Sequence, residues 1–211
     1  MSYSIESITE SIGARRMGNA PATIDWLLTD SRSLNFPEET LFFALTTKRN
    51  DGARYIADLY ARGVRNFVLS EESFRLMDNG QLTIDNAMQR DDAQSIVNYL
   101  IVPNPLKALQ KLAEQHRNRF QIPVIGITGS NGKTVVKEWL HQLLSPERAI
   151  IRSPRSYNSQ IGVPLSVWQM NEQSELAIFE AGISEPGEMR ALQNIICLLY
   201  TSPSPRDGLL S

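Results

Sequence analysis

Short apolar runs alternate with a helix-like segment in the first hundred residues. Leu41–Leu45 and Asn66–Leu69 have the length and composition of buried strands, and Arg54–Arg62 between them carries apolar side chains at helical spacing. Val97–Val102 is a further strand, whereas Ser73–Ala93 is polar and irregular and contains an Asp-Asn-Gly turn signal. This β-α-β pattern predicts a small α/β domain at the start of the chain.

A Pro-Asn-Pro sequence ends this first region. Proline suits the first turn of a helix and not its interior, so we expect Pro105 to begin a helix with Asn104 as its N-cap. Apolar residues then repeat at helical spacing to about Arg119, where a basic turn suits the helix dipole. We therefore predict one domain over residues 1–103 and a second over residues 104–196.

The second domain begins with an uninterrupted apolar strand. Pro123–Thr128 is a run of the kind found in strands that are buried on both faces of a parallel sheet. Two more buried strands and two helices are predicted at Ala149–Arg152, Leu176–Glu180, Val135–Leu144 and Pro186–Ile195. The predicted fold class is α/β, with a small α/β domain followed by a doubly wound domain.

Charge and composition exclude several classes of function. The chain carries 21 Lys and Arg residues against 23 Asp and Glu, so its net charge of -2 gives no overall positive field for nucleic acid or an anionic membrane. No apolar run approaches the ~20 residues of a membrane span. The first residues lack the apolar core of a secretory signal, and one cysteine forms no disulfide within the chain. We expect a cytoplasmic protein.

A glycine-rich loop lies between the first strand of the second domain and the following helix. It reads Gly-Ile-Thr-Gly-Ser-Asn-Gly-Lys-Thr over residues 126–134. Glycines let successive backbone N–H groups converge on a phosphate, and the helix N-terminus adds partial positive charge. A terminal lysine and threonine suit phosphate oxygens and Mg²⁺ respectively. We predict an ATP site, with a plain glycine turn as the alternative, at Gly129, Ser130, Asn131, Gly132, Lys133 and Thr134.

The loop is a variant, because Ile127 replaces the first glycine of the common pattern G-x-x-x-x-G-K-[ST]. Residues 126–134 fit the pattern G-x-[ST]-G-[ST]-x-G-K-[ST] throughout, which is typical of the Mur ligases, ATP-dependent enzymes of peptidoglycan synthesis. Tyr157–Leu165 is similar to the family segment N-x-x-x-G-[VI]-P-L, and Glu180–Glu188 is similar to its E-x-G…P-G-E segment. The chain therefore resembles the Mur ligase family from about residue 20 to residue 196.

The first domain resembles the uridine-nucleotide-binding domain of the later Mur ligases. The similar segments are Thr29–Arg32, Leu41–Leu45 and Asp51-Gly52. The resemblance implies that Asp30, Ser31 and Arg32 bind the UDP end of the substrate, because a guanidinium suits phosphate; an ordinary surface turn is the alternative. Ala53 departs from the family, which usually has His after Asp-Gly, so any contact of that imidazole is missing or replaced.

Two segments are most similar to the family member that adds D-alanyl-D-alanine to UDP-N-acetylmuramoyl-tripeptide. They are Val102–Leu109 and Glu180–Met189. Phe36–Leu45 and Gly63–Val68 are similar to a Bacteroidetes-type version of that enzyme, in which an alanine racemase is fused to the ligase. The alternatives are a sibling ligase that adds the third residue of the peptide, and a nucleotide- or UDP-sugar-binding module without ligation.

The resemblance implies amide formation through an acyl phosphate. ATP phosphorylates a substrate carboxylate and the incoming amine displaces phosphate, so catalysis depends on positioning and on neutralising phosphoryl charge. Lys133 and Glu180 are the implied catalytic residues, and Thr134 and Glu180 are the implied Mg²⁺ ligands. Asn158 is expected to approach nucleotide or substrate. The alternatives are a solvated strand end at Glu180 and a turn-forming asparagine at position 158.

The histidines and two tryptophans are interpreted as structural residues. His116 and His141 lie on predicted helices without carboxylate or cysteine partners at ligand spacing, so we expect no zinc site. We interpret both histidines as surface or boundary residues. Trp139 and Trp168 are expected to lie in the core.

The last residues differ in character from the rest of the chain. Residues 197–211 resemble the translation of a sequencing-library adapter, and not the apolar strand that the fold requires after the helix at Pro186–Ile195. We interpret them as a non-native tail that includes Cys197. On this interpretation the chain is a truncated ligase, inactive alone, without the later strands and the amino-acid-binding domain of the family.

Overall fold

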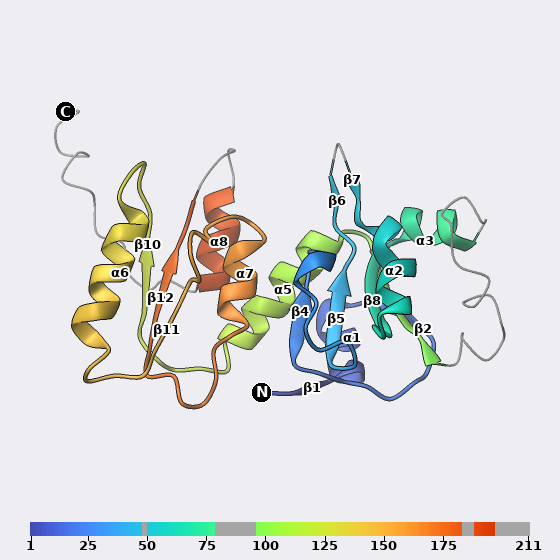
Figure 1. Cartoon of the computed structure of the whole chain (residues 1–211), viewed down its shortest axis with the longest axis horizontal. Helices are drawn as coiled ribbons and strands as arrows, with labels where there is room; N and C mark the ends of the chain where they lie inside the picture. The colour runs from blue at the N-terminus through green and yellow to red at the C-terminus, as the bar shows by residue number, and fades with distance from the viewer. Residues whose placement is uncertain (48–49, 79–95, 183–187, 197–211) are drawn as a thin grey trace. The chain divides into compact units, whose positions relative to one another are not determined.

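The chain divides into two compact units in the computed structural model, which describes residues 1–47, 50–78, 96–182 and 188–196 (Figure 1). Unit 1 spans Met1–Gln115 and unit 2 spans His116–Ser211. The boundary falls inside helix α5 (Pro105–Arg117), later than the predicted boundary at residue 103. Most of α5, up to Gln115, belongs to unit 1, and Gln115 donates a hydrogen bond of 3.0 Å to the Ser11 carbonyl.

The start of α5 is as predicted. Asn104 accepts a hydrogen bond of 3.0 Å from the Lys107 amide through its Oδ1 atom, which is the expected N-cap contact. The helix ends at Arg117, two residues before the predicted end, because the Arg119 and Phe120 amides bond three residues back in a tighter turn. No helix in the described part of the chain is long and apolar enough to cross a membrane.

Unit 1 is built on a five-stranded sheet with the order β2-β9-β8-β5-β4 (Figure 1). The strands are β2 (Arg15–Met17), β4 (Trp26–Leu28), β5 (Thr40–Phe43), β8 (Asn66–Ser70) and β9 (Asn98–Val102). β4, β5, β8 and β9 are parallel, and β2 pairs antiparallel with β9. Two short pairs are also present: β1 (Tyr3–Ser4) with β3 (Thr23–Ile24), and β6 (Thr46–Thr47) with β7 (Asn50–Asp51). The three strands predicted for the first domain are confirmed within one or two residues.

Helices lie between the strands of unit 1. They are α1 (Ile5–Ile12), η1 (Ser31–Ser33), η2 (Gly52–Tyr55), α2 (Ile56–Ala61) and α3 (Glu71–Asp78), where η marks a 3-10 helix. The expectation that Ser73–Ala93 is irregular was wrong up to Asp78; residues 79–95 lie outside the described residues. α3 forms because Phe74 and Met77, three residues apart, both pack on the core in an otherwise polar segment.

Helix α1 was not singled out from the sequence, although both of its ends carry signals. Ser4 caps its start, with Oγ accepting a bond of 3.1 Å from the Ser7 amide. Gly13 ends it in the left-handed conformation, at a φ of 69°. Ile5, Ile8 and Ile12 are buried on one face.

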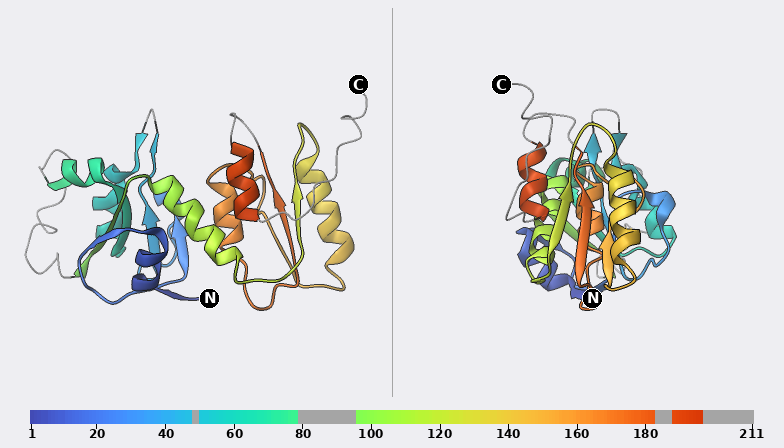
Figure 2. Two further views of the ribbon diagram at one scale, coloured as in Figure 1. Left: turned by 180° about the vertical axis from the view of Figure 1, so that it is seen from behind. Right: turned by 90° about the vertical axis from the view of Figure 1, so that its left-hand side faces the viewer.

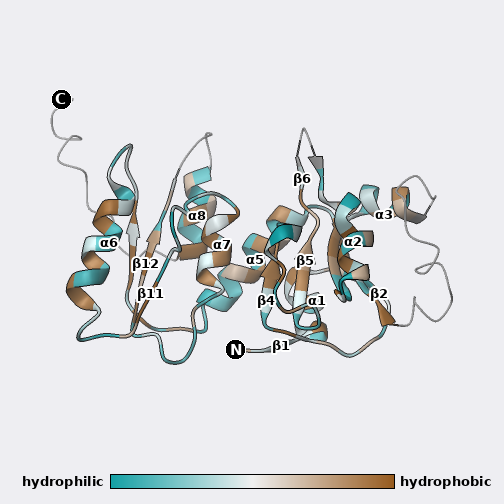
Figure 3. Cartoon of the chain, viewed as in Figure 1, coloured by the Kyte–Doolittle hydropathy of each residue, from teal (hydrophilic) through white to brown (hydrophobic). Residues whose placement is uncertain are grey.

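Apolar side chains fill both faces of the unit 1 sheet, where brown strands and helix faces are visible in Figure 3. Phe42, Phe67 and Ile101 belong to one buried cluster with Ile56 and Leu59 of α2. Successive strand residues point to opposite faces, so their neighbours along each strand face the other side of the sheet. These neighbours, which include Leu41, Phe43, Val68 and Leu100, are also buried.

A buried amide joins four segments of unit 1. The Asn98 side chain accepts hydrogen bonds from Arg16 Nε and Nη2 at 3.0 and 2.8 Å. Its Nδ2 atom donates to the Ala20 carbonyl at 3.0 Å and to Asn66 Oδ1 at 2.8 Å. Both ends of this side chain are satisfied, so the amide fixes the position of β9 relative to β2 and β8.

Unit 2 has a three-stranded parallel sheet with the order β10-β12-β11. Its strands are β10 (Val124–Ile127), β11 (Ile150–Arg152) and β12 (Leu176–Glu180), and its helices are α6 (Lys133–Leu144), α7 (Gly162–Val167) and α8 (Glu188–Ile196). α6 covers one face and α7 with α8 covers the other (Figure 2). This is the predicted doubly wound arrangement of a mixed α/β fold. The predicted residues Pro186 and Gly187 lie outside the described residues.

Two expectations about burial in unit 2 were wrong. Val124–Ile127 is only half-buried, because β10 is an edge strand of the described sheet and not a strand covered on both sides. Trp139 is 64% exposed, together with Val135, Val136 and Leu143 on the same helix, whereas Trp168 is buried as expected. The reason is that α6 turns Lys137 toward the sheet, with the half-buried Leu140 and Leu144 on the same side, and leaves the exposed apolar residues on the opposite side.

His116 is also buried, at 2% exposure, and is not the surface or boundary residue that the sequence suggested. Its Nε2 atom lies 3.0 Å from the Met170 carbonyl oxygen. Its ring packs on Phe120 and Trp168, with centroids 5.0 and 4.8 Å away. Burial in these surroundings lowers the pKa of His116 from 6.5 to about 4, because the imidazolium loses its hydration.

The buried histidine predicts an acid-dependent loss of stability. Below pH 6.5 the unfolded chain binds a proton at His116 that the fold does not bind until about pH 4. The free energy of unfolding should therefore fall between these values, by at most about 3 kcal/mol. Urea unfolding at pH 7 and pH 4 measures this loss, and His116→Gln should reduce it by more than His141→Gln, because burial also lowers the pKa of His141 but that histidine is only partly buried. An equal loss in wild type and His116→Gln would contradict the assignment.

The Asn98 network predicts a large cost for an apolar replacement. Asn98→Leu removes the acceptor of two Arg16 hydrogen bonds and the donor to the buried Asn66 Oδ1, although Arg16 keeps its bonds to Glu6 and the Ala20 carbonyl, so it should lower the free energy of unfolding by about 2–4 kcal/mol. Urea unfolding measures the change. Asn35→Leu, at an exposed position, is the matched control and should change stability by less than about 0.5 kcal/mol. Similar values for both variants would refute the structural role of the amide.

Candidate functional site

The glycine-rich loop connects β10 to α6, as the sequence predicted. Gly129 and Gly132 have φ values of 135° and 82°, which side chains rarely adopt, and an added Cβ at either position meets nothing within 4 Å. Glycine is therefore required there for backbone conformation and not for lack of space. Ser130 and Asn131 are exposed. Lys133 begins α6, and its Nζ donates a hydrogen bond of 2.7 Å to the Gly129 carbonyl, folding the ammonium back over the loop.

Glu180 lies at the carboxyl end of the central strand, beside the start of this loop. The register of the parallel pair puts Ile127 opposite Glu180. The Glu180 side chain is fully buried, so the alternative of a solvated strand end was wrong. The Thr134 hydroxyl donates a hydrogen bond of 3.1 Å to Glu180 Oε2. The structure thus brings together the two residues that the sequence assigned to Mg²⁺.

The Thr134 and Glu180 oxygens have the chemistry of a Mg²⁺ site. Mg²⁺ prefers oxygen ligands and commonly takes one or two from protein, with waters and phosphates completing its octahedron. In the described residues no group of three or more His, Cys, Asp or Glu side chains gathers in one place. One hydroxyl and one carboxylate therefore fit a cation that a nucleotide brings with it, and do not fit a closed protein cage.

Asn158 approaches the same carboxylate from the loop after β11. Its Nδ2 atom is 3.5 Å from Glu180 Oε2, at the upper limit for a hydrogen bond, and its carbonyl accepts a bond of 2.7 Å from the Gly182 amide. A Cβ at Gly182 would lie 3.0 Å from the Asn158 side chain, and one at Gly162 would lie 2.9 Å from the Tyr157 backbone. These two glycines allow the loop to pack closely against the strand end.

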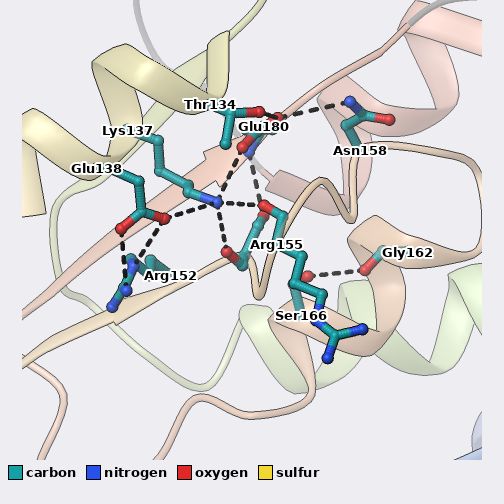
Figure 4. A network of polar contacts seen from close by, with 10 residues as sticks. Thr134, Lys137, Glu138, Arg152, Arg155, Asn158, Gly162, Ser166 and Glu180 are labelled. Atoms are coloured by element: carbon teal, nitrogen blue, oxygen red, sulfur yellow. Dashed lines mark hydrogen bonds and ion pairs between the residues drawn. The ribbon is translucent and has the colours of Figure 1, made fainter.

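Lys137 is the residue of this site that the sequence analysis missed. Its side chain is fully buried, and Nζ lies 2.9 Å from Glu180 Oε1 (Figure 4). The same ammonium donates to the Ser153 carbonyl at 2.8 Å and to the Arg155 carbonyl. The available signal was its spacing, because a residue three positions after Thr134 on a helix shares its face.

A second polar pair lies beside Lys137. Glu138 Oε1 is 3.2 Å from the Lys137 ammonium, and Glu138 Oε2 is 3.0 Å from Arg152 Nη2. The hydrogen bond from Arg152, with a smaller effect of Lys137, lowers the pKa of Glu138. Glu138 is partly exposed, and its charged partners are Lys137 and Arg152. It therefore lies beside the site without forming part of it.

Unit 1 contains a separate cavity of about 430 Å³ at the carboxyl ends of β4 and β5. Its lining consists of Thr29, Asp30, Ser31, Arg32, Leu45, Gly52 and Tyr55. The three residues predicted to bind the UDP end of a substrate therefore line one pocket. The carboxyl ends of parallel strands are a common place for ligand sites in α/β folds.

Asp30 and Arg32 are paired with each other at this pocket. Arg32 Nε and Nη2 lie 2.9 and 2.6 Å from the two Asp30 oxygens, and the Arg32 amide bonds to Asp30 Oδ1 at 3.0 Å. These bonds lower the pKa of Asp30 below its usual value. The Arg32 side chain is 87% exposed, so the pair is weak and the guanidinium can turn to a phosphate at small cost.

The residue that departs from the family pattern has an internal role. Ala53 is buried in the core of unit 1, and its amide donates 3.0 Å to Asp51 Oδ1 at the start of η2. Its side chain does not line the cavity. Gly52 does line it, and a Cβ there would lie 2.7 Å from the Leu45 amide nitrogen, so the two backbones approach too closely for any side chain.

Comparisons with known proteins identify the family of the chain. Residues 127–200 match the Mur ligase middle domain. The chain is 31% identical over 180 residues to the UDP-N-acetylmuramoyl-tripeptide--D-alanyl-D-alanine ligase of Borreliella burgdorferi, covering 84% of this chain and 37% of that protein. It is 30% identical over 172 residues to the ligase of the same name from Bacillus subtilis, covering 82% and 34%. The chain thus spans about a third of the length of these curated relatives.

Solved structures of MurF share the fold. An Acinetobacter baumannii MurF structure superposes with a TM-score of 0.75 at 23% identity, over 93% of this chain and 39% of that one. A MurF ligase from Thermotoga maritima, solved in complex with ADP, has a TM-score of 0.61 at 26% identity, over 80% of this chain and 34% of that one. Together with the family match and the curated relatives, these likenesses show that the chain belongs to the Mur ligase family.

Proposed function

We propose that this chain is the nucleotide- and UDP-substrate-binding part of an ATP-dependent ligase that adds D-alanyl-D-alanine to UDP-N-acetylmuramoyl-tripeptide. The curated relatives carry the name of that activity. The observation that carries the proposal is the contact of 3.1 Å between Thr134 of the glycine-rich loop and the buried carboxylate of Glu180. That arrangement suits a nucleotide triphosphate with its Mg²⁺ ion.

Unit 2 is the proposed ATP site. The amides of residues 129–134 face a phosphate, and Lys133 exchanges its bond with the Gly129 carbonyl for phosphate oxygens. Thr134 and Glu180 hold Mg²⁺, which when bound offsets negative charge on the phosphate oxygens. Asn158 lies next to Glu180 and orients the nucleotide or the substrate carboxylate. The MurF relative from Thermotoga maritima, solved with ADP, supports the nucleotide assignment.

The proposed reaction has two displacements. An oxygen of the substrate carboxylate attacks the γ-phosphorus of ATP, and the bond from that phosphorus to the bridging oxygen breaks. ADP is the leaving group, and the substrate carboxylate becomes an acyl phosphate. The amine nitrogen of D-alanyl-D-alanine then attacks the carbonyl carbon, loses a proton and expels phosphate as the amide forms. This chain contributes positioning and charge neutralisation to the first step, through Lys133 and the Thr134–Glu180 pair.

Unit 1 is the proposed site for the UDP end of the substrate. The cavity volume of about 430 Å³ is within the range of small-molecule sites. Arg32 offers a planar guanidinium to the diphosphate, and Asp30 and Ser31 offer hydrogen-bond partners to the remainder of the nucleotide. The position of all three in one pocket supports this assignment over an ordinary surface turn.

The ATP site predicts a strong effect of Lys133→Ala. Removal of a charged donor to phosphate should weaken binding of Mg²⁺·ADP by about 10- to 150-fold, and alanine suits the first turn of α6. Isothermal titration calorimetry measures the affinity. Lys111→Ala, at an exposed position of α5, is the control and should bind like wild type. Unchanged affinity in Lys133→Ala would refute the assignment of the loop.

The UDP site predicts that Arg32→Ala weakens UDP binding without affecting ADP. Loss of a charge-assisted contact at an exposed position should cost about 10-fold in UDP affinity. Titration of UDP and of Mg²⁺·ADP into the same variant separates the two sites. Arg15→Ala, another exposed arginine with a carboxylate partner, is the matched control. UDP binding without ADP binding in wild type would instead favour a UDP-sugar-binding module.

A further inference from the structure

The Lys137 ammonium is the meeting point of three segments of unit 2. Lys137 comes from α6, and its partner Glu180 ends β12, with Nζ and Oε1 2.9 Å apart. The Ser153 and Arg155 carbonyls, in the loop after β11, accept from the same nitrogen. Figure 4 shows these contacts, and bulk water does not compete for them because neither Lys137 nor Glu180 has exposed side-chain surface.

The two carboxylate oxygens of Glu180 have different neighbours. Oε1 faces Lys137, whereas Oε2 faces the Thr134 hydroxyl at 3.1 Å and the Asn158 amide at 3.5 Å. A carboxylate held at one oxygen cannot rotate freely about its last bond. The other oxygen is therefore presented to the glycine-rich loop in one orientation, as the strict octahedral geometry of Mg²⁺ requires.

The same ammonium also fixes the loop that carries Asn158. Among the described residues Arg155 is the only non-glycine residue with a positive φ, at 51°, a conformation that costs energy for a side chain. Its carbonyl is bound by Lys137, which stabilises that conformation three residues before Asn158. Strain of this kind persists where the surrounding structure imposes it, and it gathers at functional sites.

Stability alone gives a poor reason for a buried charge at this place. Apolar residues of similar volume often stabilise a core as well as a buried ion pair does, because both charges lose hydration. What an apolar pair cannot do is hold a carboxylate and two carbonyls in fixed directions. The geometry around Lys137 therefore points to positioning.

We propose that Lys137 is a positioning residue for the nucleotide site, which orients Glu180 toward the Mg²⁺ ion and holds the loop of Asn158 without itself touching the nucleotide. This inference rests on the proposed function, because it concerns the Mg²⁺ ligands of the proposed ATP site. It differs from a purely structural role in one respect. The Mg²⁺ dependence of nucleotide binding should depend on Lys137, whereas metal-free binding should not.

The test compares the dissociation constant of ADP in excess Mg²⁺ with that in EDTA, for the 211-residue chain. Lys137→Met should raise the constant in Mg²⁺, and so reduce the ratio of the constant in EDTA to the constant in Mg²⁺ by about 10- to 100-fold, as expected when a residue that orients a metal ligand is lost. The constant in EDTA should stay within about threefold of wild type, because Lys133 and the loop amides are unchanged. A merely structural role would raise the ADP dissociation constants in Mg²⁺ and in EDTA by similar factors.

Glu138→Gln and Lys111→Met are the matched controls. Glu138→Gln removes the charge of the second carboxylate that contacts the Lys137 ammonium and leaves the contact between Lys137 and Glu180 in place. The second replaces an exposed lysine by the same side chain. Both should keep the wild-type ratio. A normal ratio in Lys137→Met would overturn the inference and leave the proposed function intact, whereas the absence of Mg²⁺-dependent ADP binding in wild type would overturn both.

A second measurement on wild type decides the matter if Lys137→Met does not fold. Protons of a fully buried ammonium exchange slowly with water, so ¹⁵N-labelled lysine should give a protected Nζ signal from Lys137. We expect this signal to stay protected when Mg²⁺ and ADP are added, because Glu180 Oε1 keeps its contact with Lys137 Nζ while Oε2 binds the metal. Loss of protection on metal binding would show that Glu180 leaves Lys137, and would overturn the inference.

Discussion

In unit 2 one ammonium group and one carboxylate meet at the end of the central strand, out of contact with water. Thr134 and Asn158 of the candidate nucleotide site both contact the carboxylate of this Lys137–Glu180 pair. The carboxylate contacts Thr134 at the first turn of α6, and the ammonium binds the loop that leads to Asn158. Because Glu180 is buried, its carboxylate cannot move away from Lys137 without losing its ion-pair partner, and this requirement keeps the site in one arrangement.

The glycines of the site serve two distinct physical needs. At Gly129 and Gly132 the backbone adopts left-handed angles and an added Cβ would meet empty space, so the need is conformational. At Gly182 and Gly162 the need is close packing, because a Cβ would touch the Asn158 segment at about 3 Å. The first kind leaves room above the loop for a phosphate, and the second brings an amide side chain to the strand end.

Much of the fold and of both sites could be predicted because the signals are local. Apolar runs predicted the strand Leu176–Glu180 without error, and the Pro-Asn-Pro sequence predicted the start of α5. The glycine-rich loop follows a strand and precedes a helix in the sequence itself. The parallel order of these elements then places Glu180 beside the loop, since the carboxyl ends of parallel strands share one edge.

What the sequence by itself determined was therefore the elements, the loop and the residue types at the strand ends. Only the tertiary structure decided which side of each helix faces inward. Periodicity shows that Trp139 and its apolar neighbours share a face of α6, but not that Lys137 is the residue turned to the sheet. His116 is buried for the same reason, because packing against Trp168, distant in sequence, determines its surroundings. Such contacts join residues far apart in the chain, and no local pattern carries them.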